Sequence, residues 1–209
     1  VESAPCKENV VKGDKINLLK FPVPKVFPRD GGRFFGTTGY TITKDPDSDW
    51  VNLGTYRLQV LDEKTLGTQF IKGKHADLML MKYKERKKPM PVAVGIGGDP
   101  LMFLMGAARL PAFESEYEFA GAIRGEPIEV VRGETVDLPI PATAEIVVEL
   151  DFEHTFERRD GKGGWIESTD TYLARRNAKE ALEGPETWRR FDESFQLFKK
   201  GDSGYTPVK

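Results

Sequence analysis

The sequence contains a single cysteine, Cys6, in 209 residues. One cysteine excludes an internal disulfide and any metal site built from clustered cysteines, and it is typical of proteins in a reducing compartment. No apolar run approaches the roughly 20 residues of a membrane span, and the first ten residues lack the apolar centre of a signal peptide. We therefore expect a cytoplasmic protein with no membrane partner.

Net charge is also nearly absent. The 31 basic and 33 acidic residues leave a formal charge of -2, so the chain lacks the basic field that nucleic-acid binding usually requires. We expect no nucleic-acid partner. A length of 209 residues suits one domain with an appendage.

Proline, apolar periodicity and charge divide the sequence into three expected segments. Repeated prolines near the start predict an extended lead-in over residues 1–36. Residues 37–165 carry most of the strand and helix patterns and are expected to form the main domain. The remaining residues are rich in charge, and residues 166–209 are expected to form a charged helical tail that is broken by a Gly-Pro pair.

Individual elements follow from periodicity and from residues that start or end helices. Asp99 followed by Pro100 is a typical helix start, and Gly125 is a typical helix end. The segment "GIGGDP" lacks the glycine spacing of a dinucleotide fingerprint and is interpreted as a strand-to-helix turn. Helices are expected over 76–87, 99–110 and 115–125. Strands are expected over 37–44, 50–60, 66–72 and 90–98, and within 127–150 with interruptions at Gly133, Pro139 and Pro141.

Residues 49–75 look like two strands joined by a turn, yet they include Asn52, Arg57 and His75. Polar groups in a buried strand need partners. The apolar positions change phase around Gly54, and a one-residue bulge there would bring Asn52 and Arg57 onto one face, with His75 returning to the same rim. The alternative is that Asn52 caps a turn, Arg57 forms a surface ion pair and His75 is an ordinary loop histidine.

Four longer motifs occur in order along the chain. They are "GYTITKDPDSDWVNLGTYRLQVLDEKTLGTQFIKGKH", "PVAVGIGGDP", "EYEFAGAIRGEP" and "ETVDLPIPATAEIVVE". Together they resemble the central domain of the UbiD-type reversible decarboxylases, over residues from about 5 to 160. The resemblance implies an α+β fold, namely a flavin-reductase-like split β-barrel with flanking helices.

The resemblance also implies three cofactors: prenylated flavin mononucleotide (or FMN itself), Mn²⁺ and K⁺. Asn52, His75 and Glu116 fall where the family places its divalent-metal ligands, and in the family this metal holds the cofactor phosphate. Amide, imidazole and carboxylate donors are suitable for manganese. The implied potassium contacts, partly through carbonyl groups, are Trp50, Gly106, Ala108 and Glu116. The implied cofactor contacts are Thr37, Asn52, Arg57, Gly106, Ala107, Ala108, Arg109, Leu110 and Pro111. Without the resemblance, the glycine and alanines among these would fit simple helix packing.

Arg57 matches the arginine of the family's Glu-Arg-Glu catalytic set. Its planar, permanently charged guanidinium suits a substrate carboxylate or an anionic flavin edge. The family's two glutamates come from a segment shaped like E-G-P-F-G-E, and the aligned segment here is "DGKGGW". Asp160 therefore replaces the first glutamate and Trp165 the second, while Glu167 is a nearby acid that could take over. Asp160 fits an ordinary turn position equally well.

The implied activity is that of a carboxy-lyase acting on a small-molecule aromatic or α,β-unsaturated acid. Family enzymes usually carry further domains on both sides of this region, so the sequence is a fragment, a subunit of a larger enzyme or a reduced homologue. We expect a homo-oligomer, or a hetero-complex whose other subunits supply the flanking domains. The charged tail is then a docking element or a solvated helix pair. A non-catalytic flavin-binding or assembly subunit is the alternative, and flavin reduction is a third option that rests on the barrel type alone.

Overall fold

The computed structural model describes residues 1–28, 30–68 and 70–152, and four short strands further along the chain. These residues belong to two compact units. Unit 1 contains the larger sheet and the three α-helices of the described residues, and unit 2 contains a smaller sheet and two hairpins. Unit 1 consists of Val1–Ile16, Gly36–Arg57 and Phe70–His154, and unit 2 of Asn17–Phe35, Leu58–Gln69 and Thr155–Lys209.

The main element of unit 1 is a four-stranded antiparallel sheet with the order β3-β2-β6-β9. Its inner strand β6 has fully buried residues at Val92, Ala93 and Val94, which explains why its sequence is a continuous apolar run. The register of β2 on β3 places Thr43 opposite Asn52. The strands are β2 (Tyr40–Lys44), β3 (Val51–Gly54), β6 (Met90–Ile96) and β9 (Ile146–Phe152).

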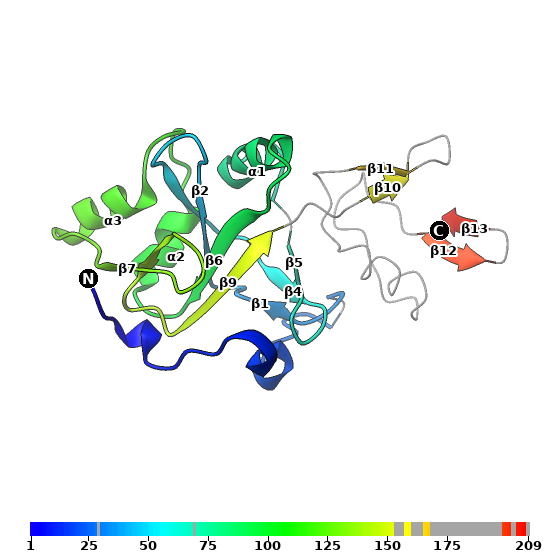
Figure 1. The fold of residues 1–209 in the computed structure, drawn as a ribbon, viewed down its shortest axis with the longest axis horizontal. Helices are drawn as coiled ribbons and strands as arrows, with labels where there is room; N and C mark the ends of the chain where they lie inside the picture. The colour runs from blue at the N-terminus through cyan, green and yellow to red at the C-terminus, as the bar shows by residue number, and fades with distance from the viewer. Residues whose placement is uncertain are drawn as a thin grey trace. The chain divides into compact units, whose positions relative to one another are not determined.

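Three α-helices contact the edge strand β3, and they are drawn in green shades in Figure 1. As predicted, α2 begins at Pro100, and the Asp99 carboxylate accepts a backbone N–H of its first turn at 2.9 Å. α3 ends at Gly125, which has a φ of 81°. None of the helices in the described part of the chain is long and apolar enough to cross a membrane. The bounds are α1 (His75–Glu85), α2 (Pro100–Ala107) and α3 (Glu116–Arg124).

The apolar core of unit 1 depends on the alternation of side chains along β2 and β3. Tyr40 and Ile42 of β2 and Leu53 of β3 belong to a buried cluster that also includes residues of α2 and α3. Thr43 lies one residue further along β2 and contacts Met79 of α1 instead. The sheet therefore presents one set of β2 and β3 residues to α2 and α3 and the alternate set to α1.

A two-stranded hairpin of β7 (Val130–Arg132) and β8 (Pro139–Pro141) packs on this core. The prediction that Pro139 and Pro141 would interrupt a strand is wrong, because both residues lie within β8. The strand tolerates them because β8 pairs with β7 alone, and Ile140 between the two prolines lies opposite Val131. The amino terminus of Val1 is held at the same hairpin by the carbonyl of Val130 at 2.7 Å.

Unit 2 contains a three-stranded antiparallel sheet with the order β1-β4-β5. The expected lead-in contributes β1, and its short 3₁₀ turn η3 (Leu18–Lys20) is capped by the side chain of Asn17. The strands are β1 (Phe34–Phe35), β4 (Leu58–Val60) and β5 (Leu66–Thr68). Two hairpins pair β10 (Glu157–Arg159) with β11 (Trp165–Glu167) and β12 (Phe198–Gly201) with β13 (Gly204–Pro207). Two further 3₁₀ turns, η1 (Pro5–Lys7) and η2 (Gly13–Lys15), belong to unit 1.

The fold is α+β, as expected, but several details differ from the sequence prediction. Residues 50–60 do not form one strand, because β3 ends at Gly54 and β4 begins at Leu58 in a different sheet. The described strands form five separate open sheets, so a split β-barrel is not confirmed. The described parts of the expected helical tail, residues 166–167, 198–201 and 204–207, lie in strands, and the rest of that tail lies outside the described residues.

Candidate metal and cofactor site

Asn52 and His75 meet where β3 approaches the start of α1. The Asn52 Oδ1 atom lies 3.2 Å from His75 Nδ1, and Asn52 is only 3% exposed. His75 is the first residue of α1, so the helix start fixes the position of its backbone. Burial, together with the neighbouring Lys74, lowers the pKa of His75. The lowered pKa favours the uncharged imidazole, which is the form that binds a metal ion.

Glu116 reaches the same strand from the start of α3. It is 2% exposed, and one of its carboxylate oxygens accepts the backbone N–H of Leu53 at 2.9 Å. This contact satisfies an N–H group of an edge strand. Burial raises the pKa of Glu116, and the hydrogen bond from Leu53 partly opposes that rise. A buried carboxylate of this kind is a good cation ligand, because a bound cation would offset the cost of burying its charge.

The strand β3 thus connects the starts of two helices and the end of a third. Its contacts with His75 and Glu116 bring the N-termini of α1 and α3 to neighbouring strand positions. Just beyond the strand, the Thr55 N–H donates to the carbonyl of Gly106, near the end of α2, at 3.2 Å. Helix N-termini attract anions such as phosphate, so this junction combines donors for a cation with a local field that favours a phosphate group.

Trp50 packs against this junction from the loop between β2 and β3. Its ring lies edge-on to His75 with centroids 4.8 Å apart, and it also contacts Phe113 with centroids 4.9 Å apart. Its indole N–H donates to the carbonyl of Glu114 at 2.9 Å, two residues before Glu116. Trp50 therefore links the start of α1 to the segment that leads into α3.

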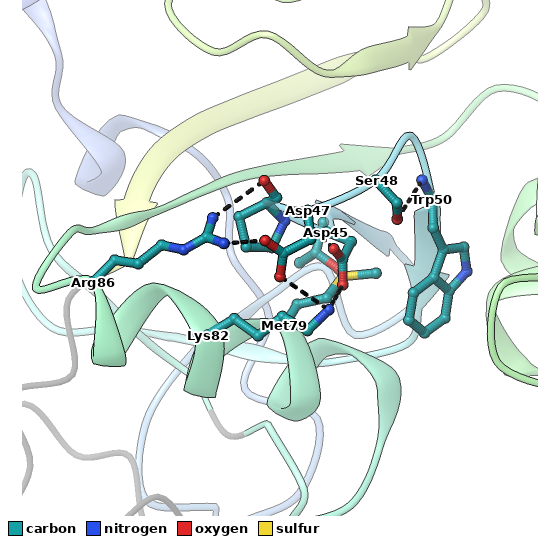
Figure 2. A network of polar contacts seen from close by, with 9 residues as sticks. Asp45, Asp47, Ser48, Trp50, Met79, Lys82 and Arg86 are labelled. Carbon is teal, nitrogen blue, oxygen red and sulfur yellow. Dashed lines mark hydrogen bonds and ion pairs between the residues drawn. The ribbon is translucent and has the colours of Figure 1, made fainter.

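The loop that carries Trp50 is tied to α1 by ion pairs (Figure 2). Lys82 Nζ lies 2.5 Å from the buried carboxylate of Asp45 and 3.4 Å from that of Asp47, and Arg86 also pairs with Asp47. The contacts of Arg86 and Lys82 hold the pKa of Asp47 below its ordinary value. Figure 2 shows Lys82, in α1, and Arg86, directly after the end of α1, extending to the loop, with Trp50 on the far side. One helix therefore positions both the His75 ring and the indole that packs on it.

The segment expected to contact the flavin begins at Gly106, which is buried against the end of β3. A Cβ added at Gly106 would meet atoms of Tyr40, Gly54 and Thr55 at 3.5–3.6 Å, which is ordinary contact. α2 ends at Ala107, and the chain then continues to Pro111 without regular structure. Within this segment Ala107, Arg109 and Pro111 are exposed, whereas Ala108 and Leu110 are half-buried.

Two of the remaining predicted site residues are exposed. Thr37 is exposed in the turn before β2, and Arg57 is exposed three residues beyond the end of β3. Asp160 lies outside the described residues, and Glu167 lies in β11 of unit 2.

The predicted bulge at Gly54 is wrong, and with it the shared strand face for Asn52 and Arg57. β3 pairs regularly with β2 as far as Gly54, which lies opposite Thr41, and the strand then stops. The ring of Tyr56 lies over Gly54, where a Cβ would come 2.3 Å from the ring. The change of apolar phase therefore reflects a chain that leaves one sheet for another.

Two donors at the junction, Asn52 and His75, are spaced like neighbouring ligands of a six-coordinate divalent ion. Bonds of about 2.1 Å in octahedral geometry place neighbouring ligand atoms about 3 Å apart, and the Asn52 oxygen and the His75 nitrogen are separated by 3.2 Å. An amide oxygen and a carboxylate are hard donors, and imidazole is tolerated beside them. Across the described ranges no cluster of three or more His, Cys, Asp or Glu side chains forms a metal-binding group, and here the third donor is an amide.

Thr43 and Met79 also belong to this region, and sequence reasoning misses both of them. The Asn52 amide nitrogen donates to Thr43 Oγ1 at 3.2 Å, and Thr43 Oγ1 donates to Met79 Sδ at 3.3 Å. A threonine in an apolar strand is unremarkable by itself. Only the register of β2 on β3 reveals that Thr43 lies opposite Asn52.

A protein-family comparison decides the chain's family. The family model described as "UbiD: 3-octaprenyl-4-hydroxybenzoate carboxy-lyase Rift-related domain" matches residues 1–183. This chain belongs to the UbiD family. One UbiD relative is the pyrrole-2-carboxylic acid decarboxylase of Pseudomonas aeruginosa, which is 38% identical over 149 residues, covering 71% of this chain and 30% of the relative.

Solved structures of UbiD-class enzymes resemble the fold. The closed form of vanillic acid decarboxylase from Sedimentibacter hydroxybenzoicus matches 78% of this chain and 36% of its own, with a TM-score of 0.68 and 33% identity. An evolved dimeric form of HmfF from Pelotomaculum thermopropionicum, in complex with prenylated FMN, matches 77% of this chain and 38% of its own, with a TM-score of 0.69 and 32% identity. The chain spans 30% of the length of the curated relatives that it matches.

Proposed function

We propose that this UbiD-family chain carries the metal and cofactor site of a reversible decarboxylase acting on an aromatic or α,β-unsaturated carboxylic acid. The observation that carries the proposal is that Asn52 contacts His75, while Glu116 accepts the backbone N–H of Leu53, the next residue of the same edge strand. Relatives support the reaction class, because one is named a pyrrole-2-carboxylic acid decarboxylase and another a vanillic acid decarboxylase. Structures of HmfF contain prenylated FMN or FMN.

In this proposal the buried residues hold the metal ion and, through it, the cofactor phosphate. Asn52, His75 and Glu116 supply ligands to Mn²⁺, and the N-termini of α1 and α3 favour the phosphate beside it. The proposed K⁺ contacts, partly through carbonyl groups, are Trp50, Gly106, Ala108 and Glu116. Because Asn52 and Glu116 are buried and hydrogen-bonded, the ligands are oriented before any ion binds. This preorganisation reduces the entropy that binding must overcome.

The flavin itself would lie along Thr37 and the backbone of the segment 106–111. Small residues at the start of that segment permit close approach of a flat ring. When bound, prenylated FMN supplies the electron sink that allows carbon dioxide to leave the acid. The proposed contribution of the protein is to hold the flavin ring in place while the metal ion holds the phosphate of the same cofactor.

Arg57 is the proposed partner of the substrate carboxylate. Its guanidinium can hold a carboxylate through two parallel hydrogen bonds, which fixes the orientation of the acid. Asp160 or Glu167 is the proposed donor of the proton that replaces carbon dioxide. Because a solved UbiD-class neighbour is a dimeric form, we propose that the enzyme works as a homo-oligomer or as a complex with other subunits.

The proposal can be tested by expressing the protein together with a flavin prenyltransferase. The absorption spectrum and a metal analysis of the purified protein report whether flavin and manganese are retained. Exchange of ¹³C-labelled carbon dioxide into a panel of aromatic and unsaturated acids then reports the reaction. We expect retained flavin and manganese and measurable exchange, and we expect Arg57→Ala to retain both ligands while losing exchange.

Other outcomes separate the alternatives. Flavin and manganese without any exchange would favour a non-catalytic flavin-binding or assembly subunit. The sequence supports this non-catalytic alternative. Asp160 and Trp165 stand where the resemblance places the two glutamates of the family's catalytic segment. Absence of both flavin and manganese from the purified protein would contradict both functions.

A further inference from the structure

Four side chains, three of them buried and the fourth half-buried, are linked in series from α1 through β2 and β3 and back to the start of α1. They are Met79, Thr43, Asn52 and His75, with successive separations of 3.3, 3.2 and 3.2 Å between their polar atoms. Thr43 and Met79 are 0% exposed and Asn52 is 3% exposed. Water therefore cannot replace Thr43 or Met79 as a hydrogen-bond partner without a structural change.

The donor and acceptor groups of these four side chains allow their hydrogen bonds to run in only one direction. A thioether sulfur carries no proton and can only accept a hydrogen bond, so Met79 takes the single hydroxyl proton of Thr43. Because that proton is used, the Thr43 oxygen can only accept a hydrogen bond from Asn52. The amide must turn its NH₂ group to Thr43, which directs Oδ1 to His75.

The opposite orientation of the amide would place the NH₂ group toward His75. An NH₂ group repels a cation and cannot act as a ligand. The two orientations have nearly the same shape, so packing alone distinguishes them poorly. A hydrogen-bond partner of fixed polarity is needed to select one of them, and Thr43 occupies that position as the cross-strand neighbour of Asn52.

We propose that Thr43 and Met79 are positioning residues that hold the Asn52 amide with its oxygen toward His75. Neither residue touches the reacting groups; both act through Asn52. The consequence for metal affinity rests on the proposed function, whereas the orientation of the amide does not. Because Asn52 Oδ1 accepts a hydrogen bond from His75 in this arrangement, the metal-free imidazole carries its proton on Nδ1.

The first test measures the tautomer of His75 in the metal-free protein by ¹⁵N NMR. The sequence contains two histidines, at positions 75 and 154, so His154→Gln provides the assignment. We expect the Nδ1–H tautomer in the unaltered protein and in Thr43→Ser, which keeps the hydroxyl. In Thr43→Val, which keeps the shape and removes the hydroxyl, we expect the Nε2–H tautomer to gain population because the amide is free to rotate.

The second test measures the affinity for Mn²⁺ in the presence of FMN, by titration of the EPR signal of free Mn²⁺. Loss of a partner that orients a metal ligand typically weakens binding by about 10–100-fold. We expect a loss in this range for Thr43→Val, a smaller loss for Met79→Leu, and near-normal binding for Thr43→Ser. Thermal unfolding of each variant reports whether the fold is retained.

The outcomes distinguish the positioning role from the proposed function. An Nε2–H tautomer of His75 in the unaltered metal-free protein overturns the positioning role, even if Thr43→Val does not fold. So does a folded Thr43→Val that keeps the Nδ1–H tautomer. If the tautomer changes as expected but the unaltered protein binds no Mn²⁺, the positioning role stands and the proposed metal site fails. If Mn²⁺ binds equally to the unaltered protein and to a Thr43→Val variant that keeps the Nδ1–H tautomer, the positioning role fails and the metal site stands.

Discussion

The buried anchor around β3 and the exposed stretch that follows it are built in different ways. Asn52 and Glu116 are 3% and 2% exposed and have identified hydrogen-bond partners in regular elements. Arg57, five residues after Asn52, is exposed and lies outside the strand. In the proposed enzyme the first region holds the cofactor and the second performs the reaction. The comparison indicates that cofactor binding and turnover can be lost separately.

The largest expected effect comes from the anchor. In Glu116→Gln the amide oxygen can still accept the Leu53 N–H, but the negative charge next to the cation is lost. We expect Mn²⁺ affinity in the presence of FMN to fall by more than about 100-fold, with loss of flavin from the purified protein. Glu118→Gln, on the exposed face of the same helix, is the matched control. Normal Mn²⁺ binding by Glu116→Gln would remove Glu116 from the anchor.

Arg57→Lys is the complementary change in the reacting region. Lysine keeps the positive charge but cannot form the planar two-bond contact with a carboxylate. We expect carbon dioxide exchange to fall by about 100-fold, in the range that positioning of a reactant supplies, while the flavin spectrum and manganese content stay unchanged. If flavin is lost together with exchange, Arg57 belongs to the anchor and the contrast between the two regions is not valid.

Gly54 is the last residue of β3 and lies between Asn52 of the anchor and the exposed Arg57. A methyl group there would lie 2.3 Å from the Tyr56 ring, so we expect Gly54→Ala to lower the free energy of unfolding by about 1–3 kcal/mol. Gly106→Ala is the matched control, because its added Cβ meets only ordinary contacts, at 3.5 Å or more, and alanine favours a helix. Chemical denaturation compares the two. Equal effects would show that the Tyr56 ring does not determine where β3 ends.

The smallest effect is expected at the loop that carries Trp50. Asp47 is exposed and pairs with Arg86 and Lys82, so Asp47→Asn should lower Tm by about 1–2 °C at neutral pH and low salt. The folded-state pKa of Asp47 lies below its ordinary value of 3.8. Its stabilising effect is therefore present above that value and lost as the pH falls through the folded-state pKa. A difference in Tm that grows toward low pH would contradict this ion pair.

The parts of the fold that sequence predicted well are those fixed by local chemistry. The start of α2 at Asp99 and Pro100, and the end of α3 at Gly125, follow from capping preferences that act within one turn. The candidate ligands Asn52, His75 and Glu116 were identified through the resemblance to UbiD-type enzymes, and their contacts could not be derived from spacing. Asn52 and Glu116 are 64 positions apart in the sequence. Only folding brings the Glu116 carboxylate to the backbone N–H of Leu53, the residue after Asn52.

The failures of prediction share a physical cause, because they involve contacts between distant residues. The phase change at Gly54 was interpreted as a bulge, since a local pattern cannot show that the chain moves to another sheet. Local sequence predicts that Pro139 and Pro141 break a strand, whereas their tolerance depends on the pairing of β8 with β7. Thr43 was overlooked because its role depends on the register of β2 and β3.

The most direct test of the metal anchor is pulsed EPR on the protein loaded with Mn²⁺ and FMN. Electron spin echo modulation detects nitrogen bound to Mn²⁺, and with only two histidines in the chain the source can be assigned by substitution. We expect a histidine nitrogen coupling that disappears in His75→Gln and persists in His154→Gln. A spectrum without nitrogen coupling, or a coupling that survives in His75→Gln, would contradict a metal site formed by Asn52, His75 and Glu116.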